Sequence, residues 1–246
     1  MVKRIYPSSQ SLNMWEIYVQ TSEFKALAHQ ISQRLILWFN KNGRDLPWRK
    51  THNPYHILVS ELMLQQTQVD RVIEYYQQFL NALPNFEAVA QAPESLLLKL
   101  WEGLGYYNRV RNLQKTARII LEKYNGTFPT QKEEILSLPG IGEYTAGAVM
   151  TFALNLREPI VDTNVNRILH RIFLYPTKNS ENSTFTKILW LLSENLLPEE
   201  NYWEFNQGIM DFGAIHCTGT KPHCFSCYLK EFCQYYQSLS LTRFFK

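Results

Sequence analysis

Four cysteines near the C-terminal end of the chain form its most distinctive set of potential ligands. They follow the spacing Cys217-x6-Cys224-x2-Cys227-x5-Cys233. Thiolates are soft ligands, and four of them suit zinc or an iron–sulfur cluster. Structural zinc sites made of four cysteines usually contain two short C-x-x-C pairs, whereas this segment contains one. The spacing therefore favours a 4Fe–4S cluster and leaves zinc as the alternative.

Glu61 is a candidate general acid. Its neighbours along the chain are apolar: Ile57, Leu58, Leu62 and Leu64. A carboxyl buried among such residues has a raised pKa and can donate a proton near neutral pH. A place on the polar face of a helix is the alternative that the local pattern leaves open.

Asp162 is a second carboxylate with a different predicted role. It precedes a helical pattern that begins at Thr163, so we expect it to cap the N-terminus of that helix. Hydrogen bonds from backbone N–H groups would keep the carboxylate ionised, and an ionised carboxylate can stabilise a cationic sugar. Capping is by itself a sufficient reason for an Asp here, and the two roles are compatible.

The segment Leu138-Pro139-Gly140-Ile141-Gly142 separates two helical patterns. Gly140 and Gly142 permit positive φ angles and close approach of the backbone to a ligand. The second helix would start with free backbone N–H groups, which bind phosphate and so grip nucleic acid of any sequence. An ordinary turn between two helices is the alternative.

The elements that must position these groups are helices throughout, which predicts an all-α fold. No segment shows a convincing strand pattern, and Asn125-Gly126 marks the end of one helix. The segment from Lys41 to Tyr55 is expected to be a loop, and the extension 1–21 is expected to be the most flexible part. The predicted helices are 23–40, 55–81, two short ones across 84–101, 107–124, 132–136, 144–154, 163–174, 184–196 and 202–214.

Composition sets wider limits on function. The 25 Lys and Arg residues against 22 Asp and Glu give a formal net charge of +3, which is compatible with a nucleic-acid partner but does not argue for one. No apolar run is long enough for a membrane span, and the N-terminus lacks the apolar core of a secretory signal. The cysteines are local rather than spread along the chain. We therefore expect a cytoplasmic protein without a membrane partner.

The cysteine run and the glycine hairpin resemble the endonuclease III superfamily of helix–hairpin–helix DNA glycosylases. Three further segments resemble the MutY family of adenine-DNA glycosylases over roughly residues 24–236: S-E-L-M-L-Q-Q-T-Q at 60–68, G-L-G-Y-Y at 103–107 and D-L-P-W-R at 45–49. The resemblance implies a two-lobed fold, with a six-helix lobe at 46–156 and a cluster-bearing lobe at 22–45 and 157–246, after the extension 1–21. It also implies one 4Fe–4S cluster held by Cys217, Cys224, Cys227 and Cys233.

The same resemblance assigns catalytic roles. Glu61 would protonate adenine and later handle the attacking water. Asp162 would stabilise the oxocarbenium ion or its enzyme adduct, supported by Tyr144 and Asn164. Lyase members of the superfamily carry a Lys where this chain has Tyr144, which cannot form a Schiff base. A monofunctional glycosylase is therefore expected, with strand cleavage left to an abasic-site endonuclease.

The binding residues follow in the same way. Arg49 and Gln207 would line the adenine pocket, while Gln66 and Tyr106 would wedge the duplex at the lesion. The resemblance implies a monomer acting on double-stranded DNA with an adenine opposite 8-oxoguanine or guanine, in a bacterial cytoplasm and associated with the nucleoid. Gly140 and Gly142 belong to the hairpin that contacts the DNA backbone.

Three departures from the family pattern leave alternatives open. The chain stops thirteen residues after Cys233, where the family has a second domain that senses 8-oxoguanine. Thr163 stands where the family usually has Gly, and the loop 218–223 is less basic than usual. A thymine-DNA mismatch glycosylase also carries Tyr and Asp at positions 144 and 162, but lacks the Gln-rich and Gly-Leu-Gly-Tyr-Tyr segments. A non-catalytic DNA-damage-binding module is the further alternative.

Overall fold

The computed structural model describes residues 6–7, 11–177 and 183–243, and the described part of the chain is helical with no strand. This confirms the all-α prediction. The chain divides into two compact units, each with its own helices. Unit 1 contains residues 1–44 and 157–246, and unit 2 contains residues 45–156. None of the described helices combines the length and the apolar character of a membrane span.

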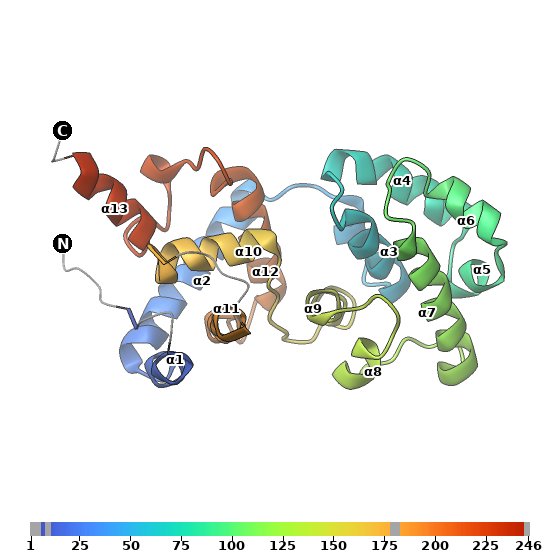
Figure 1. Cartoon of the computed structure of the whole chain (residues 1–246), viewed down its shortest axis with the longest axis horizontal. Helices are drawn as coiled ribbons and strands as arrows, with labels where there is room; N and C mark the ends of the chain where they lie inside the picture. The colour runs from blue at the N-terminus through green and yellow to red at the C-terminus, as the bar shows by residue number, and fades with distance from the viewer. Residues whose placement is uncertain (1–5, 8–10, 178–182, 244–246) are drawn as a thin grey trace. The chain divides into compact units, whose positions relative to one another are not determined.

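Unit 2 is built around α3 (Pro54–Leu64), whose side chains are buried on nearly every side. It packs against α4, α7 and α9 (Figure 1). This central place explains the run of apolar residues on both sides of Glu61, because a helix surrounded by others has no solvent-facing stripe. The other elements of the unit are η1 (Pro47–Lys50), α4 (Val69–Ala82), α5 (Phe86–Gln91), α6 (Glu94–Leu100), α7 (Asn108–Tyr124), α8 (Lys132–Leu136) and α9 (Glu143–Phe152).

Unit 1 is built around α2 (Ser22–Asn42), which packs against α11 and α12. Its core is rich in aromatic residues and includes Trp15, Phe24, Phe173, Phe205 and Phe232. The other elements of the unit are α1 (Leu12–Val19), α10 (Thr163–Leu169), η2 (His170–Leu174), α11 (Ser183–Leu196), α12 (Tyr202–Asp211), η3 (Phe212–His216), η4 (Cys224–Ser226) and α13 (Gln234–Arg243).

The single helix predicted over 55–81 is wrong. The chain forms two helices there, because α3 ends at Leu64 and α4 begins at Val69. Between them Gln66 has a φ of 55°, in the left-handed region that ends a right-handed helix. Apolar periodicity continues on both sides of the break, so the pattern gave no sign of it. The expected loop at 41–55 likewise contains a short helical turn, η1, beginning at Pro47.

The expectation of a flexible N-terminal extension is wrong for the part of it that the structure describes. Helix α1 buries Trp15 and Val19 completely. The Tyr6 hydroxyl donates a hydrogen bond to the carbonyl of Phe232 at 3.0 Å, and its ring stacks against Trp15. Residues 1–5 and 8–10, which the same expectation covered, lie outside the described residues. Tyr6, Trp15 and Val19 therefore belong to the core of unit 1.

Candidate functional site

The buried Glu61 and the half-buried Tyr144 form a polar pair inside unit 2. Helix α3 supplies the carboxyl, α9 supplies the phenol, and the two helices pack directly against each other. The Tyr144 hydroxyl donates to Oε2 of Glu61 at 2.8 Å, and Glu61 is only 4% exposed. A carboxyl so enclosed and oriented can exchange a proton with a bound ligand in a water-poor setting.

The hairpin between α8 and α9 contains one glycine with a left-handed backbone and one with an extended backbone. Gly140 has a φ of 79°, and a Cβ there would lie 2.8 Å from the amide nitrogen of Asn112, so no larger residue fits. Gly142 is extended, with φ of −100°, so of the two glycines Gly140 is the one with a positive φ. No side chain of Gly142 can cap α9, and the first N–H groups of this helix are suited to an anion.

Gln66 and Tyr106 lie on two neighbouring turns of unit 2 and both have left-handed backbone angles, 55° and 48°. Both side chains are exposed, Tyr106 by 62%. They line one cavity, whose walls are Gln65, Gln66, Tyr106, Tyr107, Asn108, Arg109 and Arg111. The structure thus brings together the two residues that the sequence assigned to a wedge.

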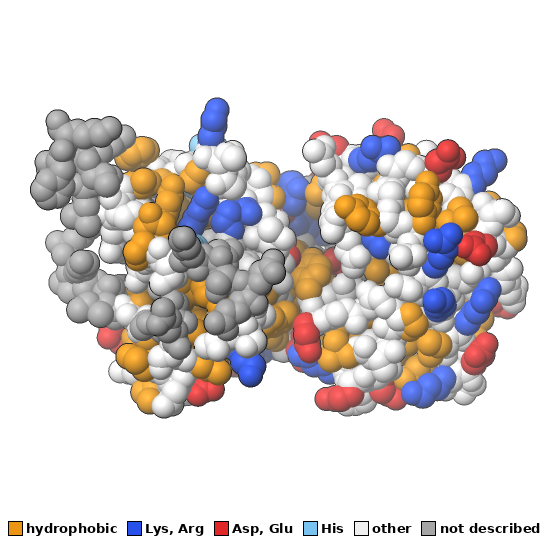
Figure 2. Space-filling model, viewed as in Figure 1, with side chains coloured by type: hydrophobic (Ala, Val, Ile, Leu, Met, Phe, Trp, Pro, Cys, Tyr) orange, Lys and Arg blue, Asp and Glu red, His pale blue; other side chains and the backbone are white. Residues whose placement is uncertain are grey.

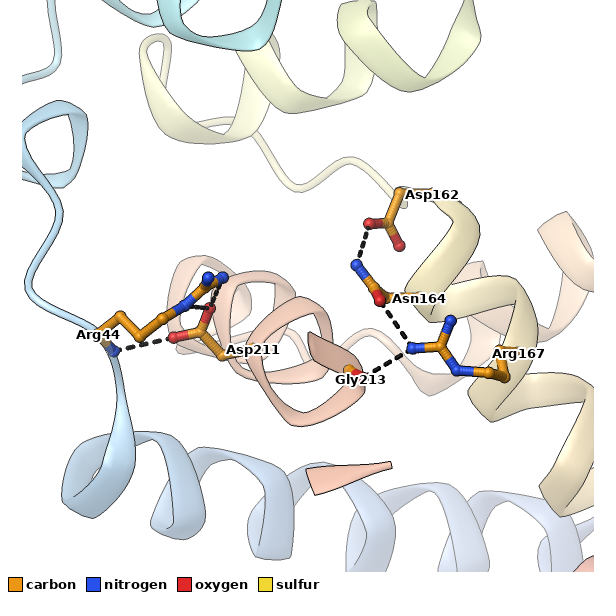
Figure 3. Close-up of polar contacts among 6 residues, drawn as sticks. All are labelled: Arg44, Asp162, Asn164, Arg167, Asp211 and Gly213. Carbon is orange, nitrogen blue, oxygen red and sulfur yellow. Dashed lines mark hydrogen bonds and ion pairs between the residues drawn. The ribbon is translucent and has the colours of Figure 1, made fainter. Parts of the chain in front are cut away.

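Asp162 caps α10, as predicted (Figure 3). Its Oδ1 accepts the N–H of Val165 at 2.6 Å, and its Oδ2 accepts the side-chain amide of Asn164 at 2.9 Å. Burial raises the pKa of Asp162, while these bonds and the charge of Arg167 lower it in part. We expected the capping bonds to lower the pKa of Asp162 and keep its carboxylate ionised. Desolvation has the larger effect, so the net shift of the pKa is upward.

The amide of Asn164 is itself held in place. Its Oδ1 accepts a hydrogen bond from Nη2 of Arg167 at 2.7 Å, and the same nitrogen donates to the carbonyl of Gly213 at 2.7 Å (Figure 3). The Nε of Arg167 donates to the carbonyl of Cys217 at 3.0 Å. These contacts fix which way the Asn164 amide faces, and so keep its N–H directed at Asp162.

A second carboxylate of unit 1, Asp211, is fully buried and paired with Arg44 (Figure 3). Its Oδ1 accepts Nε and Nη2 of Arg44 at 2.9 and 2.6 Å, and its Oδ2 accepts the backbone N–H of the same residue. This ion pair, together with the backbone bond, anchors the segment that follows α2. Gln207, a predicted pocket residue, is buried one turn earlier in α12.

The four cysteines line one cavity of unit 1 and none is in a disulfide. Nη1 of Arg171 lies 3.3 Å from Sγ of Cys217, and the N–H of Leu229 lies 3.3 Å from Sγ of Cys227. Burial raises the pKa of the Cys227 thiol to about 11 and that of Cys233 to about 12. Buried thiols are stable as thiolates when a metal or other positive charge balances them, so this donor set fits a metal group.

The spacing of these thiols bears on the kind of group. Within the described part of the chain, no three His, Cys, Asp or Glu side chains are gathered closely enough to hold a single metal ion. The four cysteines nonetheless face the same cavity. Thiolates around one zinc lie about 2.3 Å from it, whereas a cluster of several iron and sulfur atoms holds its ligands further apart. Four thiols facing one cavity are a donor set that an iron–sulfur cluster can use.

Two further features of unit 2 bear on binding: the position of Arg49 and the distribution of charged side chains on its surface. Arg49 is half-buried in η1, a turn that packs against α3. On the face of unit 2 drawn in Figure 2, Lys and Arg side chains are interspersed with Asp, Glu and hydrophobic ones. On that face the basic residues form no continuous stripe. The distribution of charge therefore does not identify a nucleic-acid surface there.

Sequence reasoning missed the residues that organise these groups: Arg44, Arg109, Arg167, Arg171 and Asp211. Most of their partners are backbone carbonyls or residues far along the chain, which local patterns do not report. One sign was available, since Arg109 shares the buried stripe of α7 with Leu113 and Ala117. A cation in that register is unusual enough to indicate a buried structural role.

Residues 59–193 match the family described as HhH-GPD superfamily base excision DNA repair protein. The chain is 43% identical over 205 residues to the adenine DNA glycosylase of Buchnera aphidicola subsp. Baizongia pistaciae, covering 83% of this chain and 58% of that protein. It is 37% identical over 212 residues to the thymine/uracil-DNA glycosylase of Methanothermobacter thermautotrophicus, covering 85% of this chain and 94% of that protein. The chain thus spans less than two thirds of that adenine glycosylase.

The fold agrees with these similarities. A solved structure of a thermostable thymine-DNA glycosylase superposes on this chain with a TM-score of 0.79 at 34% sequence identity. The match covers 86% of this chain and 97% of the other. The arrangement of helices in this chain is therefore shared with a DNA glycosylase over nearly the whole length of the latter.

Proposed function

The chain belongs to the HhH-GPD superfamily of base excision DNA repair proteins, and we propose that it is a monofunctional adenine-DNA glycosylase. Its substrate is double-stranded DNA in which adenine lies opposite 8-oxoguanine or guanine. The observation that carries the proposal is the buried carboxyl of Glu61 with the Tyr144 hydroxyl at 2.8 Å. An abasic-site endonuclease would act on the product, and the protein would work as a monomer.

Glu61 supplies the proton that the reaction needs. Neutral adenine is a poor leaving group, so cleavage of its glycosidic bond requires protonation of the base. The hydrogen bond from Tyr144 to Oε2 fixes the orientation of this carboxyl. After the bond breaks, the deprotonated carboxylate takes a proton from the attacking water.

Asp162 supplies negative charge for the sugar. Loss of the base leaves an oxocarbenium-like ion, which a fixed carboxylate stabilises without reorganising. The bonds from Val165 and Asn164 hold this carboxylate in one orientation. Burial raises the pKa of this carboxyl, and the two bonds offset that rise in part.

The four cysteines would hold one 4Fe–4S cluster. Bound there, the cluster would link the four cysteines covalently and so fix the fold of the segment 217–233. The carbonyls of Cys217, Thr218 and Gly219 already accept hydrogen bonds from Arg171. That arginine therefore orients the first ligand segment and offsets part of the thiolate charge.

Thymine release is the second candidate function. It is favoured by the 94% coverage of the thymine/uracil-DNA glycosylase of Methanothermobacter thermautotrophicus. Adenine is preferred because Glu61 lies within the segment S-E-L-M-L-Q-Q-T-Q at 60–68, which resembles the adenine-DNA glycosylases. Its carboxyl is also placed to give a proton, which departure of a purine such as adenine requires.

Four duplexes distinguish these functions, each with one labelled A·G, A·8-oxoguanine, T·G or A·T pair. After incubation with the full chain, hot alkali should break the labelled strand at adenine in the first two duplexes only. Without alkali the strand should stay intact, since Tyr144 cannot form the Schiff base of a lyase. Breakage at T·G alone would replace adenine with thymine, and duplex binding without any breakage would indicate a non-catalytic module.

The Asn164→Ala variant should shift the acid limb of the pH–rate profile to higher pH. The reason is that the Asn164 amide stabilises the ionised form of Asp162 at 2.9 Å, so its loss raises the pKa of Asp162 further. Falling pH would then protonate Asp162 sooner and remove the anion that the reaction needs. Single-turnover rates of adenine release across pH measure the limb.

The Asn195→Ala variant is the matched control for this shift. Asn195 is also in unit 1, and its amide donates to the carbonyl of Leu191 at 2.8 Å, away from Asp162. Its profile should overlay that of the unmodified protein. An acid limb that stays in place in Asn164→Ala would mean that Asp162 does not titrate in the reaction.

A further inference from the structure

Arg109, in the first turn of α7, is the most heavily hydrogen-bonded side chain described in unit 2. It is 7% exposed, and its guanidinium donates chiefly to main-chain carbonyls. Nη1 donates to the carbonyls of Leu62, Met63 and Gln65 at 2.7, 2.9 and 2.6 Å. Nη2 donates to those of Leu104 and Gly105 at 2.9 Å each. Arg109 thereby ties together two turns far apart in the sequence.

The charge of this arginine is balanced by dipoles. No carboxylate among the described residues forms an ion pair with it; carbonyls and the Thr67 hydroxyl are its partners. The carbonyls of Leu62 and Met63 lie at the C-terminal end of α3, where helix carbonyls lack partners and the helix dipole is negative. A buried cation is costly, so its retention here indicates that the geometry it imposes is needed.

The two turns that Arg109 joins carry Gln66 and Tyr106. Both residues have left-handed backbone angles, which non-glycine residues adopt only when the surroundings hold them there. The guanidinium carbon lies 5.6 Å from the ring centre of Tyr106 and 5.5 Å from that of Trp101. The exposed Tyr106 ring is therefore supported on one side by a fixed cation.

The same guanidinium touches the helix of the proposed acid. Glu61 immediately precedes Leu62, whose carbonyl accepts the bond from Arg109 at 2.7 Å. Any displacement of Arg109 would move the end of α3 together with both turns. One side chain thus sets the positions of Gln66, Tyr106 and the last turn of the Glu61 helix relative to one another.

We propose that Arg109 is a positioning residue that holds Gln66 and Tyr106 as a preformed wedge in register with Glu61, so that entry of the wedge into a duplex delivers the extruded base to the acid. This rests on the proposed function for the identity of the base. It goes beyond that function by assigning base extrusion to a side chain that need not touch DNA. Lysine cannot replace it, because a single ammonium has three donors and no planar fork to span five carbonyls.

The test compares Arg109→Lys with Arg118→Lys in the full chain. Arg118 is on the same helix, is exposed, and donates to one carbonyl, that of Ala90. The first readout is the fluorescence of 2-aminopurine placed opposite guanine, which rises when the base leaves the stack. The second is the single-turnover rate of adenine release, taken at duplex concentrations on both sides of half-saturation.

Arg109→Lys should lose the fluorescence rise and slow saturated adenine release by about 10- to 100-fold, as displacement of a positioned group by about 1 Å does. Its affinity for a duplex with an abasic-site analogue should stay close to that of Arg118→Lys, since no base has to be extruded there. An unchanged fluorescence rise in Arg109→Lys would overturn the proposal. So would an equal loss on the abasic duplex, which would indicate a general structural role.

Two further variants keep the test decisive. In a Gln66→Ala/Tyr106→Ala background, Arg109→Lys should cause little additional loss of extrusion, because it acts through these two residues. If Arg109→Lys does not fold, Thr67→Val removes a hydroxyl that accepts from Arg109 at 3.4 Å and donates to the carbonyl of Gln65 at 3.3 Å, and it should weaken the fluorescence rise in the same direction. No change in Thr67→Val would then count against the proposal. Fluorescence reports extrusion without chemistry, so a protein that releases no adenine would refute the proposed function and still test Arg109.

Discussion

The Glu61→Gln variant should bind mispaired duplex normally and release adenine about 10²- to 10⁴-fold more slowly, the range for loss of a general acid. Glutamine keeps the size of the side chain and can still accept the hydrogen bond that Tyr144 donates at 2.8 Å. It cannot protonate the base. Single-turnover rates at saturating protein measure the loss, and the retained affinity shows that the site is intact.

The matched control is Glu102→Gln, an exposed glutamate of the same unit. It should release adenine at the rate of the unmodified protein, because solvent surrounds its carboxyl. If Glu61→Gln kept more than a tenth of the rate, another group would be the proton donor. If it lost affinity for the duplex together with activity, Glu61 would have a structural role in α3.

The fold was predictable because helical periodicity is a local property. Apolar residues at three- and four-residue spacing identified nearly every helix, and Asn125 ends α7 in the left-handed conformation expected of a helix C-cap. The break between α3 and α4 was not predictable in the same way. It depends on Gln66 holding a φ of 55°, and the bonds that favour this conformation come from Arg109, more than forty residues away.

In the candidate site, too, the features set by neighbouring residues were predictable and those set by distant residues were not. The capping role of Asp162 depends on the three residues that follow it, so it could be predicted from the sequence. In the structure its carboxylate accepts the N–H of Val165 at 2.6 Å. The direction of the pKa shift of Asp162 did not follow, since it depends on burial by residues distant in the chain. The partner of Asp211 is 167 residues away, and no local pattern indicates such a pair.

The cysteine segment has one feature that local sequence predicts and one that depends on distant residues. Its spacing is local and predicted the ligand set, whereas its attachment to unit 1 depends on contacts from α10, η2 and the N-terminal segment. Arg171 binds the carbonyls of Thr218 and Gly219 at 2.7 and 2.8 Å, and Tyr6 binds the carbonyl of Phe232 next to Cys233. Arg167 connects the carbonyl of Cys217 to Asn164. Loss of the proposed cluster would therefore disturb residues beyond the segment itself.

The Cys227→Ser variant should lose the brown colour and the iron of the purified protein, about four atoms per chain for one 4Fe–4S cluster, and unit 1 should unfold at a lower temperature. The reason is that the four ligands come together only when the segment folds, so the free energy of binding the metal group also stabilises the folded segment. Iron analysis, visible absorbance and thermal unfolding measure the three effects.

The control is Ser226→Ala, an exposed neighbour whose hydroxyl donates to the carbonyl of His223. It should change none of the three. A colourless unmodified protein containing one zinc ion would contradict the cluster, and retained iron in Cys227→Ser would remove this thiol from the ligand set.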